Sequence, residues 1–157
     1  MAHDPVNRRT YLFGGEDEPS VLGDLWSYEG GTWSLVNQGA LRPSARALHA
    51  LEYSPDLGGV VLYGGVDNSC TSALARCAFL ADAWLWKDNA WTRLLDEHGE
   101  PAAGQPRDGL RDGQPRALGN PSLAYDPARQ GLLLRGDGVN SWTFTAAPAA
   151  RQAGVVW

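Results

Sequence analysis

The chain has 157 residues and a formal net charge of −5, and its 19 glycines and 10 prolines indicate a turn-rich β protein. Nucleic-acid binding would need the opposite charge, and no apolar run approaches the roughly 18 residues of a membrane span. The N-terminus has no basic start followed by an apolar core, so no signal peptide is expected and a soluble, cytoplasmic protein is the first expectation.

The first predicted elements follow the N-terminus directly. Residues 3–15 contain an apolar run that ends in the doublet Gly14-Gly15, and residues 24–36 contain two further runs around an Asp, two Trp and one Tyr. Each run has the length of a strand and is bounded by Gly, Pro, Asp or Asn, which is typical of short antiparallel strands.

A complete unit follows in residues 46–94. It holds four short apolar runs, at 47–53, 59–63, 83–86 and 91–94, and the second run ends in the doublet Gly64-Gly65. The short turn at residues 87–90 suits two neighbouring antiparallel strands. We therefore predict a four-stranded antiparallel meander here.

The unit is an internal repeat. Its second-strand segment recurs with constant spacing at 3–15, 53–65 and 125–137, and its third and fourth strands recur at 24–36 and 82–94. The third copy is degenerate, because residues 139–144 match the fourth strand best and leave the third strand missing or reduced.

First-strand segments begin with Pro-x-Ala-Arg or Pro-Arg, at 43–51 and 115–125, and the C-terminal residues 148–157 supply one more. Since the N-terminus starts where such a strand should end, we expect 148–157 to close the first unit. The single domain 1–157 would then consist of units 1–42 plus the closing strand 148–157, 43–105 and 115–147.

The repeated residues resemble kelch repeats, over nearly the whole chain, and are most similar to bacterial kelch-like proteins. The resemblance rests on the glycine doublets and on the aromatic residues that follow them, namely Trp26, Tyr28, Trp33, Trp84, Trp86 and Trp91. It implies an all-β propeller whose four-stranded blades surround a channel, with the arginine-bearing first strand innermost. We expect the six aromatic side chains to be buried between blades.

Three units are fewer than the roughly 4 to 8 blades of a propeller, so open sheet edges are expected. We predict a homodimer in which residues 151–157 add beside residues 11–15 of a two-fold-related copy, closing a six-bladed ring. The remainder of a longer protein, or a different propeller half, are the alternative partners.

Candidate ligand-binding residues come from two places. The resemblance places the first-strand arginines at the channel mouth, with a histidine on one of those strands, and the loops after the second strands open on the same face; the candidates are Arg46, Arg116, Arg151, His49, Asp17, Asp67 and Asn68. Guanidinium groups there could hold a carboxylate, a sulfate or an acidic peptide. The alternative is that each arginine caps a strand end or pairs with a neighbouring aspartate, and that the histidine is packed and hydrogen-bonded.

The insertion at 66–81 holds both cysteines, Cys70 and Cys77. Their spacing suits a loop-closing disulfide, which would indicate an oxidising compartment and secretion; free thiols are the alternative, and a metal site lacks a Cys-x-x-Cys pair and nearby histidines.

No Gly-x-Ser-x-Gly, His-Glu-x-x-His or phosphate-binding loop is present. Kelch relatives include copper radical oxidases and iron-dependent specifier proteins, but neither ligand pattern can be placed in this chain. We therefore expect a non-catalytic module without a cofactor that binds a protein, peptide or glycan. The alternatives are a hydrolase, lyase or isomerase with its site at the channel mouth, and a purely structural assembly module.

Overall fold

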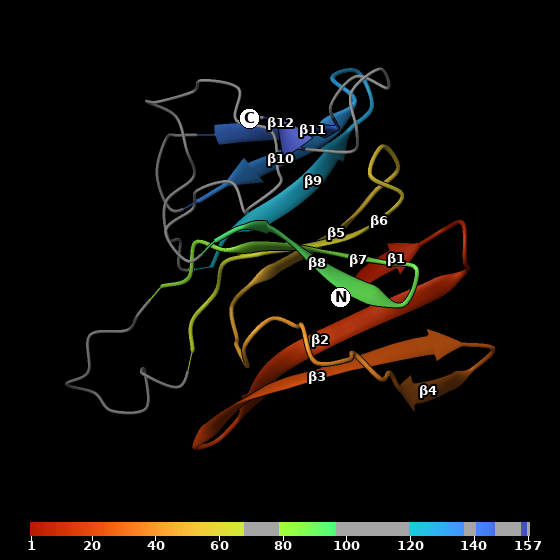
Figure 1. Ribbon diagram of the computed structural model, residues 1–157, viewed down its shortest axis with the longest axis vertical. Helices are drawn as coiled ribbons and strands as arrows, with labels where there is room; N and C mark the ends of the chain where they lie inside the picture. The colour runs from red at the N-terminus through yellow and green to blue at the C-terminus, as the bar shows by residue number, and fades with distance from the viewer. Residues whose placement is uncertain (68–78, 97–119, 137–140, 147–154, 157) are drawn as a thin grey trace.

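The computed structural model describes residues 1–67, 79–96, 120–136, 141–146 and 155–156. These residues form strands and turns without a helix, and the strands make three four-stranded antiparallel sheets, none of them closed into a barrel (Figure 1). The all-β class and the four-stranded antiparallel sheets expected from the sequence are confirmed. Within the described ranges, no helix is long and apolar enough to cross a membrane.

The first sheet has the order β1-β2-β3-β4. Its strands are β1 (Ala2–Asp4), β2 (Arg9–Asp17), β3 (Ser20–Glu29) and β4 (Thr32–Leu35). The Asp4 carboxylate accepts the N–H groups of Val6 at 2.9 Å and Asn7 at 3.0 Å, so a tight turn leads from β1 straight into β2. The first sheet thus has its own first strand, and the prediction that residues 148–157 supply it was wrong.

The second sheet has the order β5-β6-β7-β8 and confirms the meander predicted for residues 46–94. Its strands are β5 (Ala50–Ser54), β6 (Gly59–Tyr63), β7 (Ala83–Lys87) and β8 (Ala90–Leu95). Between β7 and β8, Asp88 and Asn89 both have positive φ, at 50° and 58°. Two such residues in a two-residue loop match the twist of the flanking strands.

The third sheet contains β9 (Ser122–Asp126), β10 (Gly131–Arg135), β11 (Ser141–Ala146) and β12 (Val155–Val156). Its order is β12-β11-β10-β9, so β11 pairs directly with β10 and is the third strand, not the fourth. Strand β12 pairs with β11 and not with a β2 strand, so the predicted closing role of the C-terminus was wrong. This pairing covers the edge of β11 at Thr145 and Ala146.

The three sheets stack face to face, and their first strands β1, β5 and β9 lie near one another (Figure 1). The second sheet lies between the other two, and all five residues of β6 are buried. Because side chains alternate along a strand, Val60 and Leu62 pack toward the first sheet while Val61 and Tyr63 pack toward the third.

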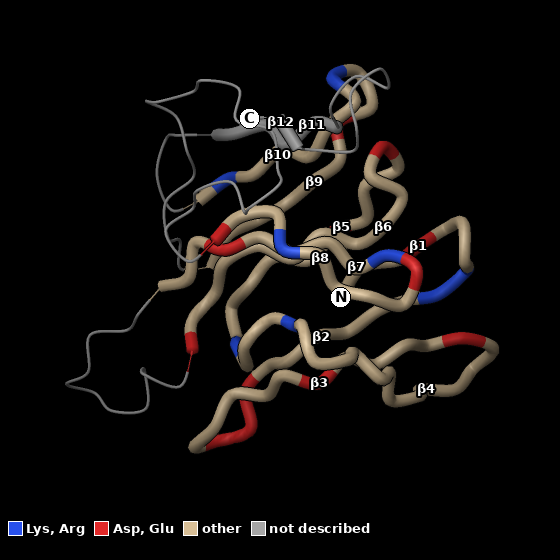
Figure 2. Tube along the Cα trace, in the orientation of Figure 1, with Lys and Arg blue, Asp and Glu red and all other residues tan. Residues whose placement is uncertain are grey.

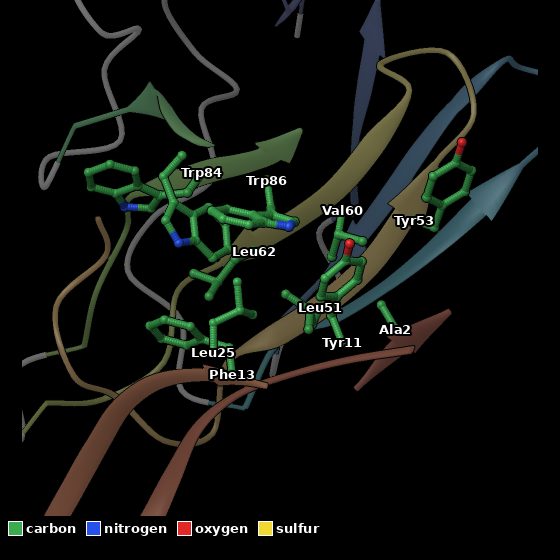
Figure 3. Packing of buried hydrophobic residues seen from close by; sticks show 11 residues of the cluster. Ala2, Tyr11, Phe13, Leu25, Leu51, Tyr53, Val60, Leu62, Trp84 and Trp86 are labelled. Atoms are coloured by element: carbon green, nitrogen blue, oxygen red, sulfur yellow. The ribbon is translucent and has the colours of Figure 1, made fainter. Parts of the chain in front are cut away.

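Aromatic rings fill the interface between the first two sheets (Figure 3). Tyr11 meets Trp86 edge-on with ring centroids 6.4 Å apart, and Phe13 meets Trp91 in the same way at 5.7 Å. Such edge-to-face pairs add to the stabilisation that burial alone provides. The prediction that Trp84, Trp86 and Trp91 are buried between sheets is confirmed.

Candidate functional site

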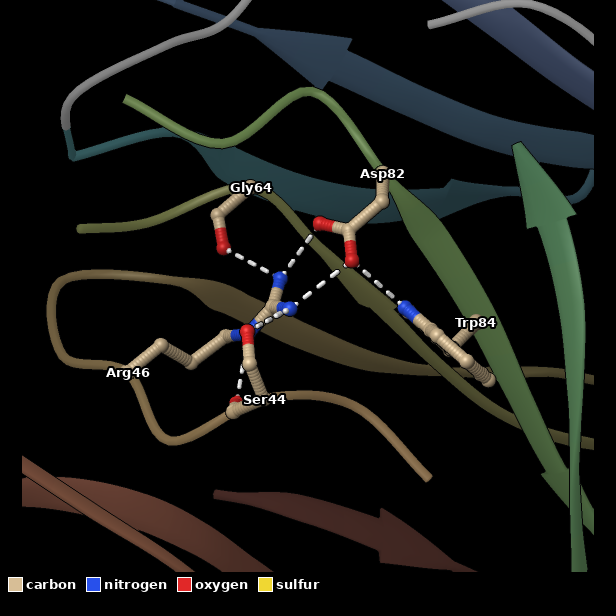
Figure 4. A network of polar contacts seen from close by, with 5 residues as sticks. All are labelled: Ser44, Arg46, Gly64, Asp82 and Trp84. Atoms are coloured by element: carbon tan, nitrogen blue, oxygen red, sulfur yellow. Dashed lines mark hydrogen bonds and ion pairs between the residues drawn. The ribbon is translucent and has the colours of Figure 1, made fainter. Parts of the chain in front are cut away.

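Arg46 is fully buried and paired within the chain. Its guanidinium donates to both carboxylate oxygens of Asp82, at 2.6 and 2.8 Å, and to the carbonyl of Gly64 at 3.0 Å (Figure 4). Ser44 accepts two further bonds, and the indole of Trp84 donates to the same carboxylate at 2.7 Å. Arg46 therefore fits the alternative of pairing with a neighbouring aspartate, and its placement as a ligand-binding residue was wrong.

The main chain of Arg46 belongs to a different contact. Its N–H donates to the carbonyl of Leu22 at 2.9 Å, and its carbonyl accepts the N–H of Gly15 at 3.0 Å. Gly14 has φ +51°, and a Cβ atom there would lie 2.5 Å from the Arg46 carbonyl oxygen. The glycine doublet thus lets the backbone of the first sheet approach a residue whose side chain is held by the second sheet.

His49 lies between the first two sheets rather than on a rim. Its ring packs edge-on against Phe13 with centroids 5.6 Å apart. Its Nδ1 atom is buried without a hydrogen-bond partner among the described residues. Burial, and then the nearby Arg46 charge, lower the pKa of His49 to about 4, so the ring is neutral at pH 7.

The loops after the second strands meet in an acidic hollow of about 370 Å³. Glu16, Glu18 and Asp67 line it together with Val66, and the acidic β2–β3 hairpin is marked red in Figure 2. Asp17 is exposed on the same hairpin but does not line the hollow. The described lining carries carboxylates and no arginine, which favours a cationic ligand over the anion expected from the sequence.

The remaining sequence candidates lie outside the described residues. These are Arg116, Arg151, Asn68, Cys70 and Cys77. Their roles, and the disulfide, stay predictions. In the described part of the chain, no group of three or more His, Cys, Asp or Glu residues is arranged to hold a metal ion.

The outward face of the first sheet is aromatic and exposed. Tyr28 and Trp33 face each other across β3 and β4, are 39% and 42% exposed, and have ring centroids 5.1 Å apart. Leu35, which pairs with Trp26, is 63% exposed. The prediction that all six aromatic residues are buried was wrong for Tyr28 and Trp33, which are exposed, and for Trp26, which is only half-buried, because none of the described sheets covers this face.

The corresponding face of the second sheet is buried. Trp86 and Trp91 occupy the repeat positions of Tyr28 and Trp33 and pair across β7 and β8 in the same register. Each is only 3% exposed, because the first sheet lies on top of them. One repeated surface therefore occurs twice in the chain, once covered and once open.

Sequence reasoning missed the two aspartates of the repeat, Asp24 and Asp82. Each accepts the indole N–H of the tryptophan two residues later, Trp26 or Trp84. The signal is the Asp-x-Trp pattern at constant offset, which aligns the strands of the two units but does not by itself predict the contact between the two side chains.

Comparison with known proteins gives a fold relative only. No family model matches the chain, and no curated protein matches it. Among solved structures, YjhT is similar with a TM-score of 0.56 and 14% identity, covering 94% of this chain and 42% of the YjhT chain. At this identity the likeness concerns the fold alone, and this chain spans less than half the length of YjhT.

Proposed function

We propose that the chain is a non-catalytic binding module whose three sheets are blades of a kelch-type propeller and whose first sheet docks a second copy. One observation carries the proposal. The open face of Tyr28, Trp33 and Leu35 repeats the face that the second sheet buries through Trp86 and Trp91. A contiguous apolar patch of this kind marks an interaction surface in soluble proteins.

The covering surface would come from the third sheet of the second copy. Its residues Leu132 and Leu134 pack toward the second sheet, so Leu133 points to the opposite face, with Ala124 as its cross-strand neighbour. The small side chain of Ala124 leaves room for a large ring of the first sheet, and Leu133 offers it an apolar contact. Two copies joined by both contacts make a closed two-fold assembly of six sheets.

Ligands would bind on the loop face of this assembly. In the hollow lined by Glu16, Glu18 and Asp67, the exposed carboxylates of Glu16 and Glu18 would bind a cationic group on a protein, peptide or glycan. A peptide and glycan array, probed with the native protein and with Glu18→Gln, tests this part. Binding that ignores the substitution would contradict the hollow as the site.

Light scattering after size exclusion tests the assembly. We expect the native chain to run at twice its 16.9 kDa mass and Trp33→Asp to run as a single chain, because a buried carboxylate on the docked face is not tolerated. The matched control is Val6→Asp, which places the same charge at a 75% exposed position in the β1–β2 turn.

A native protein that stays monomeric across a dilution series would contradict docking by a second copy. So would a dimer that survives Trp33→Asp. The alternatives of a hydrolase, lyase or isomerase and of a purely structural module gain no specific observation from the described residues, and both stay predictions.

A further inference from the structure

The Arg46 site shows which atoms of a sheet hold a guanidinium group. The second sheet contributes three acceptors, namely both carboxylate oxygens of Asp82 and the carbonyl of Gly64. The other two acceptors belong to Ser44, which lies two residues before the arginine and is therefore part of the same chain segment. Trp84 fixes the carboxylate by donating its indole N–H to one oxygen.

The first sheet repeats the acceptors of this site. Asp24 stands at the repeat position of Asp82, and the indole of Trp26 donates to its Oδ2 atom, as Trp84 does in the second sheet. Gly14 stands at the position of Gly64, and the two glycines have similar left-handed φ angles, +51° and +66°. The Asp–Trp contact and the left-handed glycine are therefore common to both sheets, although the β2–β3 ladder continues past its glycine doublet and the β6–β7 ladder ends at Tyr63.

The two sheets differ in the group that pairs with the carboxylate, because Asp82 pairs with Arg46. A hollow of about 750 Å³ opens beside Asp24, lined also by Leu35, Asn37 and Arg42. Asp24 is half-buried, and among the described residues no arginine pairs with it. A half-buried carboxylate that is fixed by an indole and faces a hollow is suited to a charge-assisted, bidentate contact with a planar cation.

We propose that the Asp24 carboxylate, fixed by the Trp26 indole, is a binding site for a guanidinium group that is presented by an arginine in an extended polypeptide. This site is separate from the acidic loop hollow and adjoins the apolar face of Trp33, because Leu35 belongs to that face and also lines the hollow beside Asp24. A residue like Ser44 two positions before the arginine would add the contacts seen at Arg46. Arg42, exposed on the rim, carries the same charge as the ligand, so Arg42→Ala should increase the affinity.

The test uses the full chain and the synthetic acetylated peptide Pro-Ser-Ala-Arg-Ala-Leu-His-Ala, the sequence of residues 43–50 that fills the site of the second sheet. Calorimetry gives the affinity, and the NMR signal of the Trp26 indole N–H reports the site directly. We expect the peptide with citrulline in place of arginine, and the protein variant Asp24→Asn, to bind at least about tenfold more weakly.

Trp26→Phe keeps the ring but removes the donor, and should weaken the binding in the same direction. Circular dichroism confirms that each variant is folded before its affinity is compared. The proposal is overturned if the peptide does not bind, if citrulline binds as well as arginine, or if Asp24→Asn leaves the affinity unchanged.

The arginine could come from a second copy of the chain or from another polypeptide, and measuring self-association distinguishes these two sources. If a second copy supplies it, Asp24→Asn and free peptide both weaken the native dimer; if another polypeptide supplies it, peptide binding is lost while the dimer is unchanged. Failure here is distinguishable from failure of the proposed assembly, because Trp33→Asp tests the apolar contact and leaves Asp24 in place.

Discussion

At the scale of single residues, the buried pair of Arg46 and Asp82 is the strongest link between sequence and structure. The side chain of Arg46 is held by the second sheet and its main chain by the first. Desolvating two charges is costly, and the pair is stable only because every contact around it is made. Removing one partner would leave the other charge buried and alone.

Asp82→Asn should therefore lower the free energy of unfolding by about 3 to 5 kcal/mol, measured by urea denaturation. The matched control is Glu29→Gln, which breaks the exposed pair of Arg9 and Glu29 at 2.8 Å. That change should cost at most about 1 kcal/mol, because solvent screens exposed ion pairs. Similar losses for the two variants would show that the buried pair has no special role.

His49 predicts a pH dependence. Because burial lowers its folded-state pKa to about 4, below the unfolded value, the unfolded chain binds the extra proton between about pH 6.5 and pH 4. Stability contributed by the neutral ring is present above that window and is lost as the pH falls through it, by up to about 3 kcal/mol.

His49→Gln removes the titrating group. Denaturation midpoints measured from pH 7 to pH 4 should then fall less steeply than in the native protein. An unchanged slope would mean that the ring does not resist protonation in the folded state.

At the scale of elements, the glycine doublets determine how closely neighbouring sheets approach. Gly14 and Gly30 have nearly the same φ, +51° and +58°, but only Gly14 has backbone atoms where a Cβ would be placed. Comparing them separates the strain of a left-handed residue from the steric clash around Gly14, where a Cβ would lie 2.5 Å from the Arg46 carbonyl oxygen and 2.7 Å from that of Leu22.

Gly30→Ala should cost about 1 to 2 kcal/mol from backbone strain alone. Gly14→Ala should cost clearly more, because its Cβ would lie 2.5 Å from the carbonyl oxygen of Arg46. Thermal or chemical denaturation of the two variants measures the difference. Equal costs would argue against tight contact at this point.

The sequence predicts the elements unevenly. The second sheet could be predicted because its four apolar runs are separate and its turns are clear. Strand β1 was missed because it has three residues and no apolar run. Strand β11 was assigned the wrong position because tryptophan occurs in both the third and the fourth strands of the repeat, and only pairing with β10 settles which one it is.

At the scale of the whole molecule, the same repeated surface is buried in one sheet and exposed in another. The sequence could predict which aromatic residues form this surface, but not that Tyr28 and Trp33 are open, because exposure depends on the neighbouring sheet. The same holds for Arg46, whose burial depends on Asp82, which lies 36 residues further along the chain. The sequence identifies a charged residue, but whether solvent reaches it depends on the packing of the folded chain.

The exposure of Trp33 in solution depends on whether a second copy covers the outward face of the first sheet. Paramagnetic relaxation by a soluble spin label, measured at each indole N–H across a dilution series, reports how far solvent reaches each ring. We predict that Trp33, which is 42% exposed in the single chain, becomes as protected at high concentration as Trp91, which is 3% exposed. A Trp33 signal that stays accessible where the mass has doubled would contradict docking through this face.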